Sequence, residues 1–259
     1  MPKLQDRVAL ITGAGRGIGR AISLGYAREG ASIAATARTE HELDSLVREI
    51  TALGTKAIAI PADLTRPTAA GEIVRRALEA FGALDILVNN AGVGSSGSAR
   101  PLVDFDDRFW DLTLAVNLTS PYLLCRAVLP TMLSKKKGRI INIASIAGKI
   151  GLMHGVAYAA SKHGLLGLTR TLALEVAKAG ITVNAICPGP VRTAMHEKRL
   201  EYDAKRLGVK AEDLEKSLTP IGRRLQPEEI VPLAVLLASD ESAAITGQAF
   251  NICGGIVMF

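Results

Sequence analysis

The sequence lacks the features that mark secreted, metal-binding and membrane-spanning proteins. Its three cysteines, Cys125, Cys187 and Cys253, are odd in number and far apart, and they show no paired metal-ligand spacing. This pattern favours buried thiols in a reduced, cytoplasmic protein without a metal site. No stretch approaches 18 uninterrupted apolar residues, and residues 1–7 are polar. We therefore expect neither a membrane span nor a signal peptide.

Extended basic runs and repeats are also missing. The formal net charge is +6, yet no basic stretch interleaved with aromatic residues indicates a nucleic-acid surface. We interpret Lys135-Lys136-Lys137 as a solvated loop. No repeat or linker divides the 259 residues, of which 48% are hydrophobic and 22% charged, as in well-packed globular proteins. We expect a single domain over residues 1–259 and no nucleic-acid partner.

What the sequence does contain is an alternation of short apolar, β-rich segments with helical ones. Strands are expected over 7–12, 32–37, 56–60, 84–88, 139–143, 181–186 and 248–252. Helices are expected to end at 28 and 177 and to cover 40–53, 69–81, 106–132 and 227–238. This order predicts an α/β fold with a doubly wound, mostly parallel seven-stranded sheet and helices on both faces.

The first expected strand runs into a glycine-rich turn. Residues 12–19 read Thr-Gly-Ala-Gly-Arg-Gly-Ile-Gly. The order of strand, turn and helix aims free backbone N–H groups and a positive helix end at a pyrophosphate. The common G-x-G-x-x-G spacing does not fit, because Ile18 or Arg20 falls where its third glycine belongs. A purely structural turn is the alternative.

The second expected strand ends in Ala37-Arg38. Folds that bind NAD usually place an acidic residue near this point to bond the ribose hydroxyls, whereas an arginine accommodates a 2′-phosphate. Here Ala37 replaces the acid, and Arg16 in the glycine turn supplies a second cation. The two arginines predict NADP(H) as the cofactor, unless one or both are merely solvated.

A candidate catalytic pair follows in the second half of the chain. Tyr158 and Lys162 are four residues apart, so on a helix they share one face. An ammonium favours the phenolate, but moving a phenol pKa from about 10 to about 7 takes roughly 4 kcal/mol. A second cation is therefore expected nearby. The spacing alone is weak evidence, because Tyr122 and Arg126 have it too.

Two further residues fit the same site. Ser145 follows the expected strand 139–143 at its carboxyl end, where open α/β sheets place ligands, and its hydroxyl can polarise a carbonyl. Pro121 has no N–H, so the carbonyl of Asn117 loses its helical partner and the helix is expected to kink. That carbonyl can hold a water, unless the kink is the proline's only effect.

Together these motifs resemble the short-chain dehydrogenase/reductase family over essentially the whole chain. The matching strings are T-G-x-x-x-G-x-G at 12–19, N-N-A-G at 89–92, Ser145, Tyr158-x-x-x-Lys162 and P-G-x-V-x-T at 188–193. Segments 161–164, 219–223 and 253–255 resemble those of 3-oxoacyl-[acyl-carrier-protein] reductases and polyketide ketoreductases.

The resemblance implies a Rossmann fold and an NADPH-dependent reduction of a ketone to a secondary alcohol. The implied substrate is a 3-oxoacyl thioester of acyl-carrier protein or coenzyme A, and the implied assembly is a homotetramer or dimer. Cofactor-binding motifs are expected mainly in 7–93, catalytic and substrate-binding elements mainly in 94–259, and a lid over about 193–219.

Roles for individual residues follow from the same resemblance. Ser145 and Tyr158 bind the ketone oxygen, Lys162 lowers the tyrosine pKa, and Asn117 holds a relay water. Asn89 is expected to tie neighbouring strands together. The cofactor-binding residues are Gly13, Gly15, Arg16, Gly17, Ile18, Gly19, Arg38, Asp63, Leu64, Asn90, Ala91, Gly92, Tyr158, Lys162, Pro188, Gly189, Val191 and Thr193. The substrate residues are Gly94, Ser145, Leu152, His154, Tyr158 and Met195.

The lid and the substrate leave alternatives open. Basic lid residues either meet the phosphates of a coenzyme A or acyl-carrier-protein arm or form a solvated helix face. They are Lys198, Arg199, Lys205, Arg206 and Lys210. Rival functions are a nucleotide-sugar epimerase or dehydratase, a dehydrogenase of a sugar, steroid or small alcohol, and a catalytically dead NADP-binding regulatory protein.

Overall fold

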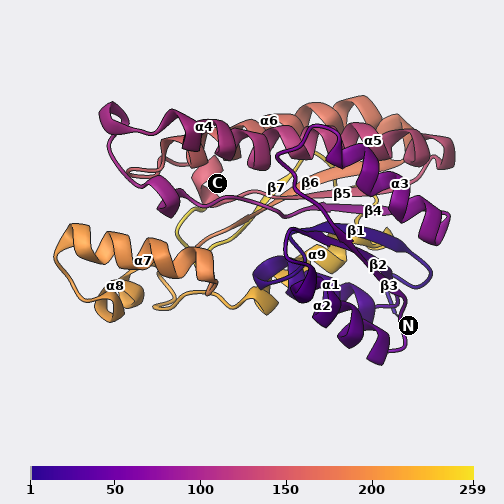
Figure 1. The fold of residues 1–259 in the computed structure, drawn as a ribbon, viewed down its shortest axis with the longest axis horizontal. Coiled ribbons are helices and arrows are strands. Elements are labelled where there is room, and N and C mark those ends of the chain that lie inside the picture. Colours follow the sequence, from indigo (N-terminus) through magenta and orange to yellow (C-terminus); the bar gives the residue numbers. More distant parts are fainter. Residues whose placement is uncertain (1) are drawn as a thin grey trace.

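The computed structural model describes residues 2–259, and Met1, where the expected domain starts, lies outside them. Seven strands of the described part form one sheet in the order β3-β2-β1-β4-β5-β6-β7 (Figure 1). They are β1 (Val8–Thr12), β2 (Ser32–Ala37), β3 (Ala57–Pro61), β4 (Ile86–Asn89), β5 (Gly138–Ile143), β6 (Ile181–Pro188) and β7 (Ala249–Ile252). All six neighbouring pairs are parallel. The predicted seven-stranded sheet is confirmed, and it is wholly rather than mostly parallel.

Helices cover both faces of this sheet (Figure 1). They are α1 (Gly17–Arg28), α2 (Glu40–Ala52), α3 (Ala69–Phe81), α4 (Asp107–Leu114), α5 (Ser120–Lys135), α6 (Val156–Val176), α7 (Ala194–Leu207), α8 (Ala211–Ser217) and α9 (Val231–Ala238). Helices α1, α2 and α9 bury apolar side chains such as Ile22 and Leu237 on one face. Helices α3, α5 and α6 bury Ile73, Val128 and Leu172 on the other. The predicted doubly wound layering is confirmed.

Helices α4 and α5 run on as one helix, Asp107–Lys135, through a π-helical turn at Ala115–Thr119. The predicted irregularity before Pro121 therefore takes the form of a widened turn. Within residues 2–259 this is the one helix that is long and apolar enough to cross a membrane. A core helix meets the same criterion, and Leu124 and Val128 of this helix pack into the core.

The expected lid and the expected lysine loop both lie at the surface of the molecule. The expected lid forms α7 and α8, which lie together at one end of the molecule (Figure 1). The expected solvated loop is confirmed for Lys136 and Lys137, which lie between α5 and β5, whereas Lys135 is the last residue of α5. Lys135 and Lys137 remain partly exposed and pair with Asp85 and Asp240. The three cysteines are free and buried, as predicted.

Candidate functional site

The catalytic candidates come from the end of β5 and the start of α6. Tyr158 and Lys162 share one face of α6, and Lys162 Nζ lies 5.7 Å from the centroid of the Tyr158 ring. Lys162 is buried, and its ammonium donates a hydrogen bond to the Ile143 carbonyl at 2.8 Å. Ser145, two residues beyond β5, lies close enough to Tyr158 to lower the pKa of its phenol. The structure brings these side chains together at the carboxyl edge of the sheet.

Desolvation governs the proton affinities of this group. It raises the pKa of Tyr158 by more than the hydrogen bond with Ser145 lowers it. Desolvation also lowers the pKa of Lys162, to about 8. In the protein alone the pKa of Tyr158 is therefore raised, whereas the resemblance implies a lowered pKa. To form the Tyr158 phenolate near neutral pH, a second cation is still required besides Lys162, as predicted from the sequence.

Asn117 is fully buried in the π-helical turn, near Lys162. Its side chain accepts from the Val93 N–H at 2.7 Å and donates to the Val93 carbonyl at 3.0 Å and to Ser161 Oγ at 3.1 Å. A Cβ on Gly92 would lie 3.4 Å from Asn117 Oδ1 and 3.9 Å from Lys162 Nζ. Because the protein satisfies the amide, a relay water at this position has to be held by the main chain.

The glycine turn leaves room and free donors for an anion. Helix α1 has no acidic residue in its first turn and no side-chain cap, so its first N–H groups are left for a ligand. Gly13 and Gly17 have φ of 64° and 56°. A Cβ on Gly13 would lie 2.9 Å from Ala91 Cα, and one on Gly19 would lie 2.3 Å from the Gly13 carbonyl oxygen. This backbone-lined turn fits a pyrophosphate, while Ile18 packs against the core.

The segment after β4 braces this turn. Thr12 Oγ1 accepts from the N–H groups of Asn90 and Ala91, both at 3.0 Å, and Asn90 Nδ2 donates to the Thr12 carbonyl at 2.8 Å. The Asn90 side chain therefore supports the glycine turn, and the cofactor contact of Asn90 stays a prediction. Asn89 donates to Asn142 Oδ1 at 2.8 Å across β4 and β5, which confirms its predicted supporting role.

The expected 2′-phosphate end contains a carboxylate that sequence reasoning missed. Glu42, in the first turn of α2, lies 3.7 Å from Arg16 Nη1. A Cβ on Gly15 would lie 2.7 Å from the same carboxylate. Arg38 follows β2 and faces Asp63 closely enough for their charges to interact. Arg16 and Arg38 supply two cations near the end of β2, where no acidic residue stands, and this arrangement fits a phosphate. Glu42 competes with such a phosphate for Arg16.

Asp63 and Leu64 follow β3. Asp63 Oδ1 accepts hydrogen bonds from the Thr65 N–H at 3.0 Å and the Thr65 hydroxyl at 2.9 Å. These bonds lower the pKa of Asp63, with smaller contributions from the charges of Arg38 and Arg66. Leu64 packs against the core. Asp63 is therefore ionised and held in place by its own loop.

The turn after β6 closes over the glycine turn. Pro188 ends β6, and a Cβ on Gly189 would lie 2.8 Å from the Cα of the residue at 253. Val191 is buried, and Thr193 caps α7 with its hydroxyl. A Cβ on Gly17 would lie 3.2 Å from Thr193 Cγ2. The two predicted cofactor-binding turns thus meet, so one dinucleotide bound at the glycine turn also reaches the turn after β6.

The predicted substrate residues lie where the lid meets the body. A Cβ on Gly94 would lie 2.5 Å from Met195 Cγ, so α7 covers the loop after β4. His154 has a left-handed φ of 54°, and its Nδ1 lies 2.7 Å from the Tyr202 hydroxyl. Leu152 is half-buried in the same loop before α6. The lid therefore contacts both predicted pocket loops.

Comparison with known proteins agrees with this geometry. Residues 7–204 match the family model of the short chain dehydrogenases. The chain belongs to the short-chain dehydrogenase family. Its predicted family and Rossmann fold are thereby confirmed, and with them an oxidoreductase that uses a nicotinamide cofactor.

Relatives of this short-chain dehydrogenase extend over its whole length. It is 42% identical over 254 residues to the granaticin polyketide synthase putative ketoacyl reductase 1 of Streptomyces violaceoruber, covering 96% of this chain and 92% of that protein. It is 38% identical to the 3-oxoacyl-[acyl-carrier-protein] reductase FabG of Thermotoga maritima, with coverages of 99% and 100%. The crystal structure of a single-substitution variant of actinorhodin polyketide ketoreductase with NADPH superposes with a TM-score of 0.92 at 36% identity, covering 98% of each chain.

Among the basic lid residues of this short-chain dehydrogenase, Arg199 fits neither the predicted phosphate contact nor the predicted solvated helix face. Arg199 is buried, with its Nε 2.6 Å from Asp203 Oδ2, so it neither faces solvent nor awaits a phosphate. Arg206 pairs with the same Asp203 at 3.3 Å. The lysines remain exposed and open to either prediction; they are Lys198, Lys205 and Lys210.

Sequence reasoning missed a second buried arginine beneath the lid. Arg224 is 4% exposed and donates to Glu197 of α7 at 2.8 Å and to Glu215 of α8 at 3.1 Å. The residue before it, Arg223, forms an exposed pair with Glu229. Two adjacent arginines thus have opposite environments, and the sequence carried no signal that separates them.

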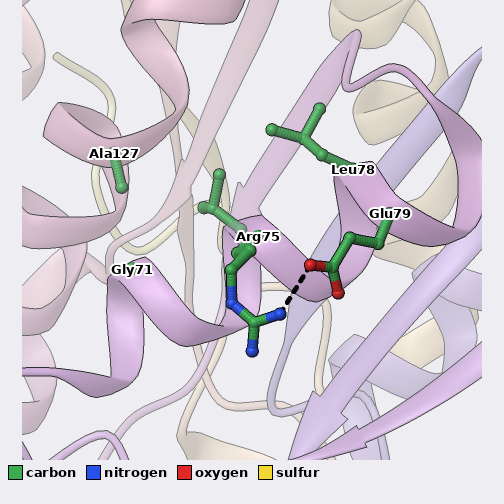
Figure 2. Close-up of a pocket in the computed structure, with 6 residues that line it drawn as sticks. Gly71, Arg75, Leu78, Glu79 and Ala127 are labelled. Carbon is green, nitrogen blue, oxygen red and sulfur yellow. Dashed lines mark hydrogen bonds and ion pairs between the residues drawn. The ribbon is translucent and has the colours of Figure 1, made fainter.

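A surface groove lies away from these residues. It has a volume of about 450 Å³ and runs between α3 and α5, lined by Val74, Leu78 and Ala127 (Figure 2). An Arg75–Glu79 ion pair borders it, as Figure 2 shows. It contains none of the catalytic candidates, so we assign it no chemistry. Among residues 2–259, no group of three His, Cys, Asp or Glu side chains is arranged to hold a metal ion.

Proposed function

We propose that this short-chain dehydrogenase reduces the ketone of a 3-oxoacyl thioester, carried by acyl-carrier protein or coenzyme A, with NADPH. The observation that carries the proposal is the meeting of Tyr158, Ser145 and Lys162 between the glycine turn and the lid. The ketoacyl and 3-oxoacyl reductase relatives support the substrate class, and the NADPH-bound ketoreductase supports the cofactor. We further infer a cytoplasmic homo-oligomer, a dimer or tetramer.

Each catalytic side chain has one task in this reaction. A bound nicotinamide supplies the hydride for the ketone carbon. The raised pKa of Tyr158 keeps its phenol protonated. The phenol donates its proton to the ketone oxygen as negative charge develops on that oxygen. Ser145 donates a hydrogen bond to the same oxygen. Lys162, charged below about pH 8, stabilises the phenolate left behind. The main chain at Asn117 holds the water that returns a proton.

Replacing the phenol tests the assignment. We expect Tyr158→Phe to lower kcat for ketone reduction by at least about a thousandfold, because general acid catalysis is removed, while NADPH binding by fluorescence stays within about twofold. Tyr122→Phe is the matched control, since Tyr122 has an arginine at the same spacing but lies exposed on α5. Turnover of Tyr158→Phe near the wild-type value would remove Tyr158 from this role.

A substrate and cofactor panel tests the remainder. The wild-type enzyme is expected to reduce 3-oxoacyl thioesters with a higher kcat/KM for NADPH than for NADH, and Arg38→Ala is expected to remove most of that difference. Reduction of sugar or steroid ketones but not of thioesters overturns the substrate class. A clear NADH preference overturns the argument from Arg16 and Arg38.

A further inference from the structure

Arg199 lies at the junction between the lid and two loops that flank the catalytic tyrosine. Its Nη1 donates to Ser95 Oγ at 3.1 Å, and its Nη2 donates to the Met153 carbonyl at 2.7 Å. Ser95 belongs to the segment after β4, and Met153 belongs to the loop before α6. A single side chain from α7 therefore holds both loops, which are 58 residues apart in the sequence.

The guanidinium is held in this position by its own helix. Asp203 accepts from Nε at 2.6 Å and from Nη2 at 3.1 Å, a two-point geometry that arginine matches and lysine does not. The Arg199 guanidinium also lies 5.5 Å from the centroid of the Tyr202 ring. Only 9% of Arg199 is exposed. Its four hydrogen bonds are consequently shielded from water and worth more than those of a surface arginine.

The same part of α7 restrains an unfavourable backbone conformation. His154 adopts a left-handed φ of 54°, which is costly for a residue with a Cβ. Its ring is bound by the Tyr202 hydroxyl at 2.7 Å, and the carbonyl just before it is the one that Arg199 holds. Helix α6 begins two residues later, and Tyr158 lies in its first turn. The lid thus acts on the segment that leads directly into the catalytic helix.

We propose that Arg199 is a positioning residue that assembles the substrate site by fixing α7 onto the loops at Ser95 and Met153. The effects that we expect Arg199 to have on the kinetics of ketone reduction rest on the proposed function. The glycine turn and the two cofactor arginines lie on other elements, although Thr193, a predicted cofactor contact, caps α7. The loops that Arg199 holds carry predicted substrate residues, so we expect its main effect on substrate binding. We expect a long acyl thioester, but not a small ketone, to extend beyond Tyr158 as far as these loops. Arg199 therefore favours extended substrates over small ones.

The chain offers a matched control for this role. Arg199 and Arg206 are on the same helix and bind the same carboxylate, but only Arg199 reaches the two loops. We compare Arg199→Met with Arg206→Met, using Arg199→Lys as a milder variant that keeps the charge and Tyr202→Phe to remove only the bond to His154. Circular dichroism confirms folding before each measurement.

Kinetics and hydrogen exchange give independent readouts. For Arg199→Met we expect KM for a 3-oxoacyl thioester to rise at least about tenfold, a smaller change for a small cyclic ketone, and an NADPH Kd within about twofold of wild type. Amide exchange in segments 93–99 and 150–155 is expected to accelerate. Arg206→Met should change none of these values, and Tyr202→Phe should accelerate exchange only in 150–155.

Two outcomes overturn the proposal. One is unchanged exchange in both loops of a folded Arg199 variant, and the other is an equal effect of Arg206→Met. If Arg199→Met does not fold, Arg199→Lys decides by the same two readouts. If the wild-type enzyme reduces no ketone, the proposed function fails, while loop exchange still tests the positioning role of Arg199 by itself.

Discussion

The cofactor-binding half and the lid are held in place by different interactions. Around the glycine turn, positions are set by backbone atoms, by Thr12 and Asn90 bound to main-chain groups, and by a fully apolar layer beneath them. The lid has little apolar support, since α8 buries no residue and α7 buries only Leu200 and Ala204 besides Arg199. Its position depends on the hydrogen bonds of Arg199 to Ser95 and Met153 and on the ion pairs of Arg224 with the lid.

This difference matches what each region has to do. Backbone and apolar contacts pack closely and give way only at a large cost. A few polar contacts, even when buried, hold a segment less firmly than a continuous apolar layer, so the segment opens more readily. A preformed cradle suits a dinucleotide, and we expect a segment held by few contacts to admit a substrate more easily. We therefore expect changes in the first region to abolish cofactor binding, and changes in the second to alter local stability and substrate kinetics.

The largest effect is expected from a single methyl group in the cofactor-binding half. The Cβ of Gly19→Ala would lie 2.3 Å from the Gly13 carbonyl oxygen and 2.4 Å from Asn90 Nδ2, so the turn has to shift. We expect the Kd for NADPH, measured by fluorescence titration, to rise at least about a hundredfold, or about 3 kcal/mol. Gly71→Ala in α3 is the control, because its Cβ meets nothing within 4 Å. Wild-type affinity in Gly19→Ala would contradict a cradle built from backbone.

The same contrast explains what the sequence could predict. The glycine turn, the alternation of strands and helices and the role of Asn89 were predictable, because glycine spacing and apolar runs have local structural consequences. The environments of Arg199 and Arg224 were not, since burial of a charged residue depends on contacts with distant segments. Arg199 and Arg206 occupy similar sequence surroundings, and only the packing of α7 against Ser95 and Met153 distinguishes them.

A smaller effect is expected from the arginine beneath the lid. Arg224→Met removes the side chain that joins α7 to α8 and leaves Glu215 with only the more exposed Arg192. We expect the free energy of unfolding to fall by about 2 to 3 kcal/mol in urea, with the Kd for NADPH within about twofold of wild type. Arg223→Met, at the neighbouring exposed ion pair, should lose much less stability. Equal losses in the two variants would show that Arg224 is no more important than a surface arginine.

The smallest expected effect concerns pH and also lies in the lid. Burial, aided by the nearby Arg224, lowers the pKa of His196 to about 4. Because this is below the ordinary value of about 6.5, neutral His196 contributes its full stability above pH 6.5, and that contribution is lost as the pH falls toward 4. The free energy of unfolding of the wild-type protein is expected to fall between pH 7 and pH 5. In His196→Gln we expect this fall to be smaller by about 1 to 2 kcal/mol. His163→Gln, at an exposed position on α6, should keep the wild-type slope. If the two variants show the same slope, the acid sensitivity of the protein does not arise in the lid, and the contrast between an apolar cofactor-binding half and a charge-held lid loses its electrostatic support.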